Sequence, residues 1–304
     1  MAPVKTLVCV VGPTAVGKTA VGIQLAQHFQ TVVVSADSRQ FYREMTIGTA
    51  KPSDEELAAV PHHFVNSHHI TEDYSAGDFE RDALALLEKL FLHHDVVLLV
   101  GGSGLFVRAV CNGLDDLPKP LPGVRDRLNN LYREQGLEAL QALLQQADPD
   151  YFNEMDSQNP QRVIRALEVY ESSGTPFSHF RRGQAVERPF GVLTLGLDTD
   201  RELLYRRINS RVDAMMGAGL LNEVEALLPY REKPPLQTVG YAELFDYLDG
   251  KCTLQDAVDK IKQNTRRYAK RQLTWFRKDK ATAWFAPEDM EGMMAYVSSR
   301  INPQ

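Results

Sequence analysis

The sequence is poor in cysteine, with three in 304 residues, and it lacks a long apolar segment. Cys9, Cys111 and Cys252 lie far apart, without the paired spacing of a disulfide framework or a zinc site. No run approaches the length of about 18 apolar residues that a membrane-spanning helix needs, and the few residues before Thr6 leave no room for a signal peptide. We therefore expect a cytoplasmic protein with no membrane partner.

An excess of positive charge is also missing. The 34 lysines and arginines are outnumbered by 40 aspartates and glutamates, which gives a net charge of −6. This balance argues against nucleic-acid binding over the whole surface but allows a local basic face. The histidine pairs at 62–63, 68–69 and 93–94 lack the i, i+4 spacing of a helical metal site. We expect no metal site built from them.

Residues 12–19 match the complete phosphate-loop pattern G-x-x-x-x-G-K-[ST]. A β-branched apolar run precedes the loop at 6–11 and a helical pattern follows it at 20–26, which is the context such a loop requires. There, backbone N–H groups converge on phosphate oxygens, the lysine reaches the terminal phosphates and the threonine hydroxyl can ligate Mg²⁺. We expect a phosphate-binding site formed by Gly12, Pro13, Thr14, Ala15, Val16, Gly17, Lys18 and Thr19.

The order of apolar runs predicts the fold class. Helical patterns alternate with expected strands at 6–11, 31–35, 63–65 and 95–100, and a further strand is expected at 190–197. Such alternation is typical of an α/β fold, here a P-loop NTPase-like parallel sheet flanked by helices. Strand signals vanish in between, so we predict a core of residues 1–117 and 189–304 that is interrupted by an all-helical insertion domain of residues 118–188.

The clearest helix of the insertion is expected at 161–173. Asn159 is the expected N-cap, Pro160 occupies the first helical position and Gly174 ends the helix.

The strand expected at 95–100 ends in Gly101, Gly102, Ser103 and Gly104 rather than in an acidic residue. In hydrolytic P-loop proteins an acidic residue at this place organises Mg²⁺ and water. Its absence weakens interpretations as a motor or a switch. The glycines are expected to make room for something bulky at the ligand-binding edge of the sheet.

Asp37 follows the strand expected at 31–35, within the polar run of residues 35–40. Because the carboxyl ends of parallel strands meet at the ligand crevice, we expect Asp37 to lie near whatever the loop holds. A carboxylate there can orient a nucleophile and accept its proton. The alternative is an aspartate that caps a helix or a turn.

Two basic stretches indicate a partner. On a helical wheel of residues 258–278, apolar side chains share one face, and the other face, with Trp275 near its end, carries Arg266, Arg267, Lys270, Arg271, Arg277 and Lys278. A basic stripe with an aromatic residue suits a nucleic-acid backbone and stacked bases. Arg162 and Arg165 share the polar face of the insertion helix, where ordinary surface arginines are the alternative. Together the stretches predict a basic cleft between the core and the insertion.

The chain resembles the tRNA dimethylallyltransferases over nearly its whole length and in the family's order of motifs. The segments that carry the resemblance are GPTAVGKT at 12–19, SADSRQFYREMTIGTAKP at 35–52, YSAGDF at 74–79, LLVGGSGLF at 98–106, NPQRVIRALEVYESSG at 159–174, RRINSRVDAMMGAGLLNEV at 206–224, QTVGYAEL at 237–244 and TRRYAKRQLTWFRK at 265–278. The Asp-Ser-Arg-Gln and Ile-Gly-Thr-Ala-Lys-Pro segments are specific to this family, and other phosphate-loop kinases lack them.

This resemblance implies transfer of a dimethylallyl group from dimethylallyl diphosphate to N6 of the adenosine immediately 3′ of the anticodon, in tRNAs that read codons starting with U. The product would be N6-(dimethylallyl)adenosine. Asp37 is implied to be the general base. Arg211, in the family's R-I-x-x-R segment, is implied to clamp the departing diphosphate with Lys18 and with Thr19 and its Mg²⁺ cofactor.

The implied partners are tRNA and dimethylallyl diphosphate, and we expect the protein to act as a monomer. The tRNA-binding residues that the resemblance implies are Asp37, Ser38, Arg39, Gln40, Ser103, Arg125, Gln161, Arg162, Val163, Ile164, Arg165, Arg267, Lys270, Arg271 and Arg277.

Two residues depart from the family's pattern. Ser103 stands where threonine is usual and keeps the hydroxyl, whereas Phe106 stands where tyrosine is usual and loses it. A small-molecule or nucleoside kinase is the alternative function, since it would share the loop and a lid-like helical insertion. A non-catalytic RNA-binding protein with a nucleotide switch would need the acidic residue that the strand end lacks.

Overall fold

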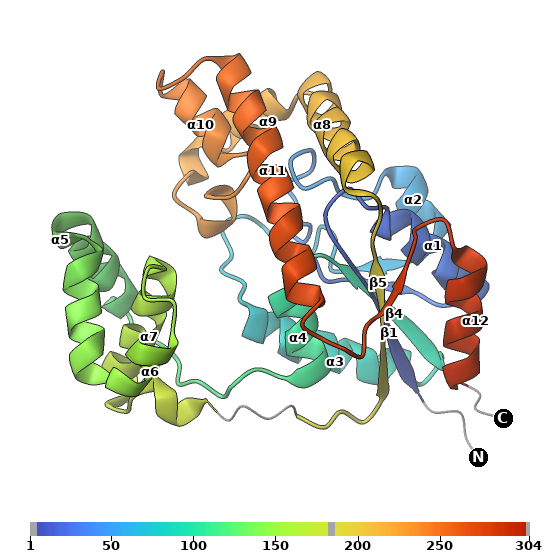
Figure 1. Ribbon diagram of the computed structural model, residues 1–304, viewed down its shortest axis with the longest axis horizontal. Coiled ribbons are helices and arrows are strands. Elements are labelled where there is room, and N and C mark those ends of the chain that lie inside the picture. Colours follow the sequence, from blue (N-terminus) through green and yellow to red (C-terminus); the bar gives the residue numbers. More distant parts are fainter. Residues whose placement is uncertain (1–4, 182–185, 302–304) are drawn as a thin grey trace. The chain divides into compact units, whose positions relative to one another are not determined.

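The computed structural model describes residues 5–181 and 186–301. The chain divides into two compact units (Figure 1), one formed by residues 1–112 and 187–304 and the other by residues 113–186. The predicted insertion, 118–188, includes residues 182–185, which lie outside the described residues. Among the described residues, no helix combines the length and the apolar character needed to cross a membrane.

Within the described residues, the larger unit is built on a six-stranded sheet in which all pairs of neighbouring strands are parallel. The strand order is β3-β2-β4-β1-β5-β6. The bounds are β1 Thr6–Val11, β2 Val33–Ser35, β3 His62–His63, β4 Val96–Gly101, β5 Gly191–Leu197 and β6 Ala283–Phe285. The predicted parallel α/β sheet is therefore confirmed.

Three strands differ from the prediction by more than one residue. The second strand, β2, begins at Val33 rather than at residue 31. The third strand lies at 62–63 rather than at 63–65, because Phe64 (φ 59°) and Asn66 (φ 55°) have left-handed backbone conformations that an extended strand excludes. Strand β6 was missed, since its three residues, Ala283–Phe285, are too few to stand out as an apolar run.

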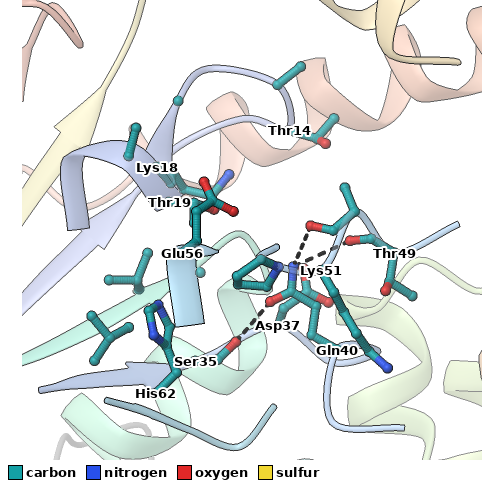
Figure 2. Close-up of a pocket in the computed structure, with 18 of the residues that line it drawn as sticks. Thr14, Lys18, Thr19, Ser35, Asp37, Gln40, Thr49, Lys51, Glu56 and His62 are labelled. Atoms are coloured by element: carbon teal, nitrogen blue, oxygen red, sulfur yellow. Dashed lines mark hydrogen bonds between the residues drawn. The ribbon is translucent and has the colours of Figure 1, made fainter. Parts of the chain in front are cut away.

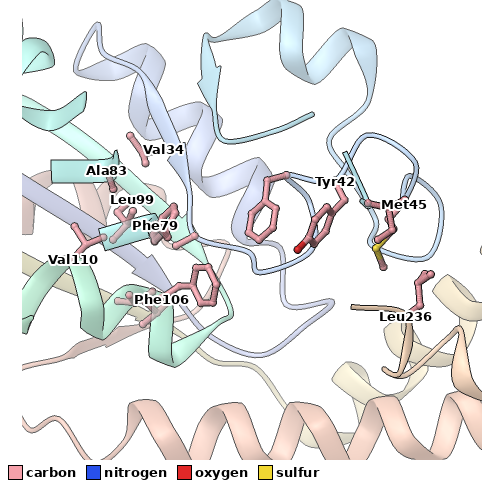
Figure 3. Close-up of a cluster of buried hydrophobic side chains, with 14 of the residues drawn as sticks. Val34, Tyr42, Met45, Phe79, Ala83, Leu99, Phe106, Val110 and Leu236 are labelled. Carbon is pink, nitrogen blue, oxygen red and sulfur yellow. The ribbon is translucent and has the colours of Figure 1, made fainter. Parts of the chain in front are cut away.

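Successive residues of β1 point to opposite faces of the sheet, and each face has its own core. Leu7, Cys9 and Val11 belong to one apolar cluster, and Val8 and Val10 belong to the other. Figure 3 shows part of the first cluster, in which Val34 and Leu99 of the sheet lie near Phe79, Ala83, Phe106 and Val110. The helices of this unit are α1 Lys18–His28, α2 Asp54–Ala59, α3 Ala76–Leu90, α4 Gly104–Asn112, α8 Arg201–Gly217, α9 Leu220–Ala226, α10 Ala242–Leu248, α11 Leu254–Phe276 and α12 Met290–Ile301.

The smaller unit is helical, and its described residues contain no strand. It consists of α5 Val124–Ala147, α6 Pro149–Glu154, α7 Pro160–Ser173 and a short 3₁₀ helix at Phe177–Phe180. Its core is formed by Leu128, Leu140, Leu144, Val163, Ile164, Ala166 and Leu167.

Helix α7 begins and ends where the sequence predicts. The Asn159 side chain accepts hydrogen bonds from the N–H groups of Gln161 and Arg162, with Pro160 in the first helical position. Gly174 closes the helix in the left-handed conformation, with φ 71°. These terminal signals are confirmed.

Candidate active site

The phosphate loop joins the end of β1 to the start of α1 at Lys18. Gly12 has a φ of 147°, and a Cβ there would lie 2.7 Å from the carbonyl oxygen of Leu197. Gly17 has a φ of 113° and forms the N-cap of α1. Both positions need glycine, for space or for backbone conformation, so the loop folds as the motif predicts.

The Lys18 ammonium folds back on its own loop. Its Nζ donates hydrogen bonds to the carbonyl oxygens of Gly12 (3.1 Å) and Pro13 (2.7 Å). Burial lowers the pKa of Lys18 to about 8, although the nearby Asp37 carboxylate opposes the shift, and Arg211 lowers it further. Within the described part of the chain Lys18 forms no ion pair with a carboxylate. A bound phosphate would be a negatively charged partner for the Lys18 ammonium.

A cavity of about 300 Å³ opens beside the loop. Figure 2 shows that its wall combines the loop with the segment after β2 and with residues 49–52. Functional side chains that line it are Lys18, Thr19, Asp37, Gln40, Lys51 and Arg211. The structure thus places all three residues predicted to be catalytic, Thr19, Asp37 and Arg211, around one cavity.

Asp37 fits both of the interpretations drawn from the sequence. Its Oδ1 accepts a hydrogen bond from the backbone N–H of Arg39 at 3.0 Å, as a turn-forming aspartate would. Among the described residues, no hydrogen bond reaches Oδ2. The turn therefore fixes the carboxylate at the cavity wall and leaves one oxygen for a ligand.

Arg211 comes from α8 and is shared by this cavity and by a neighbouring cavity that Arg207 also lines. Partial burial lowers the pKa of its guanidinium, and the carboxylate of Glu56 opposes the shift. In the part of the chain that the structure describes, Arg211 forms no ion pair. Among the described residues, Lys18 and Arg211 thus line the cavity without an ion pair to a carboxylate.

The residues after Asp37 are held by contacts within the protein. Ser103 Oγ accepts the backbone N–H of Ser38 at 3.0 Å and donates to Ser38 Oγ at 3.1 Å. Arg39 Nη1 donates to Thr238 Oγ1 (3.0 Å) and to the carbonyl oxygen of Val239 (3.1 Å). The predicted RNA contacts of these side chains stay predictions, but each also fixes the turn that carries Asp37.

Gln40 is also held by hydrogen bonds within the protein. Its Oε1 accepts a hydrogen bond from Ser35 Oγ at 3.1 Å, and its Nε2 donates to the carbonyl oxygens of Thr49 (3.3 Å) and Ala50 (3.2 Å). These bonds are drawn in Figure 2. Gln40 therefore ties the segment after β2 to Thr49 and Ala50, which also line the cavity.

The glycines at the end of β4 make room for groups of the protein itself. A Cβ on Gly101 would lie 2.3 Å from the carbonyl oxygen of Ala36, and one on Gly102 would lie 2.4 Å from Nε2 of Gln272. At Gly104 it would lie 2.2 Å from the ring of Trp275. The glycines are needed because the protein's own backbone and side chains fill this space.

Sequence reasoning missed Gln272, a buried side chain of α11. Its Oε1 accepts the N–H of Thr14 in the phosphate loop at 2.8 Å, and its Nε2 donates to the carbonyl oxygen of Gly102 at 2.9 Å. A signal existed, because Gln272 lies between Ala269 and Phe276 on the apolar face of the helix. A polar residue at such a position needs buried partners.

We expect the substitution Gln272→Met to weaken binding of the diphosphate donor about tenfold. Methionine keeps the size of the side chain but leaves the Thr14 N–H and the Gly102 carbonyl without their partner, at a cost of about 1–3 kcal/mol. Donor titrations measure the effect, with Gln263→Met, an exposed position of the same helix, as the control. Unchanged or tighter donor binding in Gln272→Met would contradict this role.

Glu223 of α9 is a second residue that sequence reasoning missed. Its Oε2 accepts the N–H groups of Thr46 (2.9 Å) and Ile47 (2.7 Å), and its Oε1 accepts the N–H of Gly48 (3.0 Å) and the hydroxyl of Tyr241 (2.7 Å). One carboxylate thus shapes the loop that leads into residues 49–52 of the cavity wall. The motif Ile-Gly-Thr-Ala-Lys-Pro does not reveal this partner, which lies far away in the sequence.

The basic face of α11 is narrower than predicted. Arg266 is turned toward α8, since its Nη1 donates to Asn209 Oδ1 at 2.7 Å, and its assignment to the basic face was wrong. Arg277 forms an ion pair with Asp198 at 2.5 Å, so that the carboxylate offsets the positive charge of Arg277 on this face. The exposed cations of the predicted face that remain without an ion pair among the described residues are Arg267, Lys270, Arg271 and Lys278.

In the helical unit, the predicted RNA-binding residues fall into two groups. Val163 and Ile164 are completely buried in its core, so the expectation that their side chains contact RNA was wrong. Arg162 and Gln161 are exposed, and Arg165 is half-buried. The predicted cleft between the core and the insertion stays a prediction.

Phe106 belongs to the core of the larger unit. Its ring centroid lies 5.1 Å from that of Phe79 and 6.0 Å from that of Phe41. The hydroxyl that a tyrosine would carry at this position is therefore not needed for packing.

Comparison with known proteins decides the family. The IPP transferase family model matches residues 40–279. The chain belongs to the IPP transferase family. Family membership confirms the resemblance to the tRNA dimethylallyltransferases and makes the chain a prenyl-transferring enzyme. It favours the transferase over the kinase interpretation.

Relatives in this IPP transferase family match along nearly the whole chain. The chain is 50% identical over 297 residues to the tRNA dimethylallyltransferase of Christiangramia forsetii, covering 97% of this chain and 98% of the relative. The crystal structure of tRNA isopentenylpyrophosphate transferase from Bacillus halodurans matches with a TM-score of 0.72 and 36% identity, over 98% of this chain and 97% of that one. A eukaryotic dimethylallyltransferase solved acting on tRNA matches with a TM-score of 0.78 and 27% identity, over 97% of this chain and 77% of that one.

Proposed function

We propose that this IPP transferase moves a dimethylallyl group from dimethylallyl diphosphate to N6 of the adenosine immediately 3′ of the anticodon, in tRNAs that read codons starting with U. The observation that carries the proposal is the cavity lined by Lys18, Arg211 and the carboxylate of Asp37, in which the two cations form no ion pair among the described residues. Two cations that form no ion pair among the described residues suit a diphosphate, and a carboxylate suits a nucleophile that must lose a proton.

In the reaction, the bond between the dimethylallyl carbon and the diphosphate oxygen breaks, and that carbon forms a bond with N6 of adenosine. Diphosphate leaves with the electron pair. Lys18, Arg211 and the amides of the loop stabilise its negative charge, and Asp37 accepts the proton that N6 loses. The strand end without an acidic residue fits this chemistry, because no water has to be activated.

Mg²⁺ fits the site, with the hydroxyl of Thr19 and the donor phosphates as its ligands. The described residues contain no cluster of three His, Cys, Asp or Glu side chains for a protein-only metal site, and Mg²⁺ bound to a substrate phosphate needs only one or two protein ligands. When bound, Mg²⁺ would neutralise part of the diphosphate charge. Thr19 would hold it through its hydroxyl.

For tRNA, the proposed contacts are the exposed cations of α11, the residues 38–40 with Ser103, and Arg125, Gln161, Arg162 and Arg165 of the helical unit. The names of the relatives support a tRNA substrate, since they are called tRNA dimethylallyltransferase and tRNA isopentenylpyrophosphate transferase. The adenosine has to leave its stack to reach the cavity, at a cost of a few kcal/mol. We propose that the protein acts as a monomer in the cytoplasm.

The test is mass analysis of nucleosides from unmodified tRNA incubated with the protein, dimethylallyl diphosphate and Mg²⁺. We expect N6-(dimethylallyl)adenosine at the position 3′ of the anticodon, and none when the donor is replaced by ATP. Absence of this nucleoside with the tRNA folded and the donor intact would contradict the proposal.

A further inference from the structure

The helical unit contains a buried carboxylate that bridges two arginines. Glu168 of α7 has a side chain that is only 1% exposed. Its oxygens accept hydrogen bonds from Nη1 of Arg125 on α5, at 3.3 and 3.1 Å, and Oε2 also accepts one from Nη1 of Arg165 at 2.6 Å. Helices α5 and α7 run side by side in this unit (Figure 1).

A carboxylate buried in this way is expensive unless its charge is compensated, and a well-packed apolar residue would often stabilise the same place better. The arginines that compensate Glu168 are themselves accessible, with side chains 46% exposed for Arg125 and 33% for Arg165. The cluster carries two positive charges against one negative charge. It therefore keeps a net positive charge at the surface.

Each arginine uses only part of its hydrogen-bonding capacity on Glu168. Both bind it through Nη1, and Nη2 of Arg125 donates to Gln161 Oε1 at 3.2 Å. In the described part of the chain, Nε and Nη2 of Arg165 have no acceptor. A guanidinium that is fixed at one end and free at the other is suited to bind a phosphate oxygen.

A neighbouring ion pair on the same two helices shows how a simple pair of opposite charges differs from the Glu168 cluster. Arg127 of α5 pairs with Glu171 of α7, one cation with one carboxylate, so that no charge remains. Glu168 differs in its complete burial and in its second arginine.

We propose that Glu168 is a positioning residue that holds Arg125, Gln161 and Arg165 as a preformed surface for the phosphate backbone of tRNA. The inference rests on the proposed function, because it takes tRNA as the ligand. Preorganisation helps because arginines that are already ordered lose less conformational entropy on binding. Glu168 itself does not touch the RNA.

The decisive variant is Glu168→Gln, since two explanations predict opposite signs. The substitution removes a negative charge, so electrostatic attraction alone would make tRNA binding tighter. Loss of positioning makes it weaker, and we expect the Kd for tRNA to rise about tenfold. The KM for tRNA should rise with it, whereas kcat at saturating tRNA and the affinity for the donor should stay the same.

The matched control is Glu171→Gln, which removes the same charge from the same helix but leaves a single arginine. Its tRNA affinity should equal that of the wild type or exceed it slightly. The salt dependence gives a further readout: the slope of log K against log salt should be unchanged in Glu168→Gln, since the arginines are still present, and lower by about one unit in Arg165→Gln.

Wild-type affinity in folded Glu168→Gln would overturn the inference, provided that the wild type binds and modifies tRNA. If the wild type does neither, the proposed function fails instead. If circular dichroism shows that Glu168→Gln is unfolded at the assay temperature, Glu168→Asp takes its place, because it keeps the charge and withdraws it by one methylene group. Weaker tRNA binding in Glu168→Asp supports positioning, and unchanged binding overturns it.

Discussion

Lys18→Ala is expected to reduce turnover by at least about 10²–10³-fold, the usual cost of removing one group that stabilises developing negative charge. Among the described residues that line the cavity, the other cations are Arg211, which belongs to the predicted clamp, and Lys51, which lies outside the phosphate loop, 2.5 Å from the carbonyl oxygen of Tyr42 and 2.6 Å from Asn66 Oδ1. Single-turnover kinetics measure the loss. Affinity for tRNA should stay normal, and a parallel collapse of tRNA binding would contradict separate sites for donor and RNA.

Because the pKa of Lys18 is lowered, the role of Lys18 in binding the diphosphate should depend on pH. With a pKa of about 8 in the free protein, the ammonium loses its charge as the pH rises through 8. Burial lowers the pKa of Lys51, in the same cavity, to about 8 as well. A diphosphate binds the protonated forms, so kcat/KM for the donor should fall above about pH 8, since this parameter reports the free enzyme. A profile that is flat up to about pH 9.5 would contradict the account.

Asp37→Asn is expected to slow the chemical step about 10²–10⁴-fold, which is the usual contribution of general acid–base catalysis. Asparagine keeps the shape of the side chain and the turn hydrogen bond to Arg39, but it cannot accept the proton of N6. Donor affinity should stay near normal, since Lys18 and Arg211 are intact. Single-turnover rates at saturating tRNA and donor separate the chemical step from binding.

The control for Asp37 is Glu56→Gln, which removes one negative charge from the wall of the same cavity. Glu56 also closes the capping box of α2 by accepting the N–H of Ser53 through Oε2, a bond that glutamine can keep. An equal loss of rate in both variants would assign the effect to the charge of the cavity. A rate above about a tenth of the wild type in Asp37→Asn would reduce Asp37 to a positioning residue.

Much of the fold could be predicted because its signals are local. The phosphate loop follows from glycines whose backbone conformation no other residue adopts easily, and α7 follows from Asn159, Pro160 and Gly174 at its ends. The buried strands β1 and β4 were visible as continuous apolar runs. Such features depend on neighbours in the sequence, and the structure places them where expected.

The residues that hold the site together could not be predicted in this way. Gln272, Glu223 and Glu168 each have a partner far away along the chain: Thr14 lies 258 positions from Gln272, Thr46 lies 177 from Glu223 and Arg125 lies 43 from Glu168. Their sequence positions show a polar residue but not which backbone groups it meets. For the same reason the sequence could not show what the glycines at the end of β4 make room for, since Trp275 and Gln272, which fill the space beside Gly104 and Gly102, come from α11.

The central claim is that the cavity holds a diphosphate that leaves intact when carbon is transferred to tRNA. Dimethylallyl diphosphate labelled with ¹⁴C in the dimethylallyl group and with ³²P in the diphosphate tests it most directly, in the presence of tRNA and unlabelled ATP. The account predicts ¹⁴C in tRNA and labelled inorganic diphosphate in equal amounts, with no consumption of ATP. Release of phosphate from ATP without donor, or ³²P transferred to an acceptor, would contradict it.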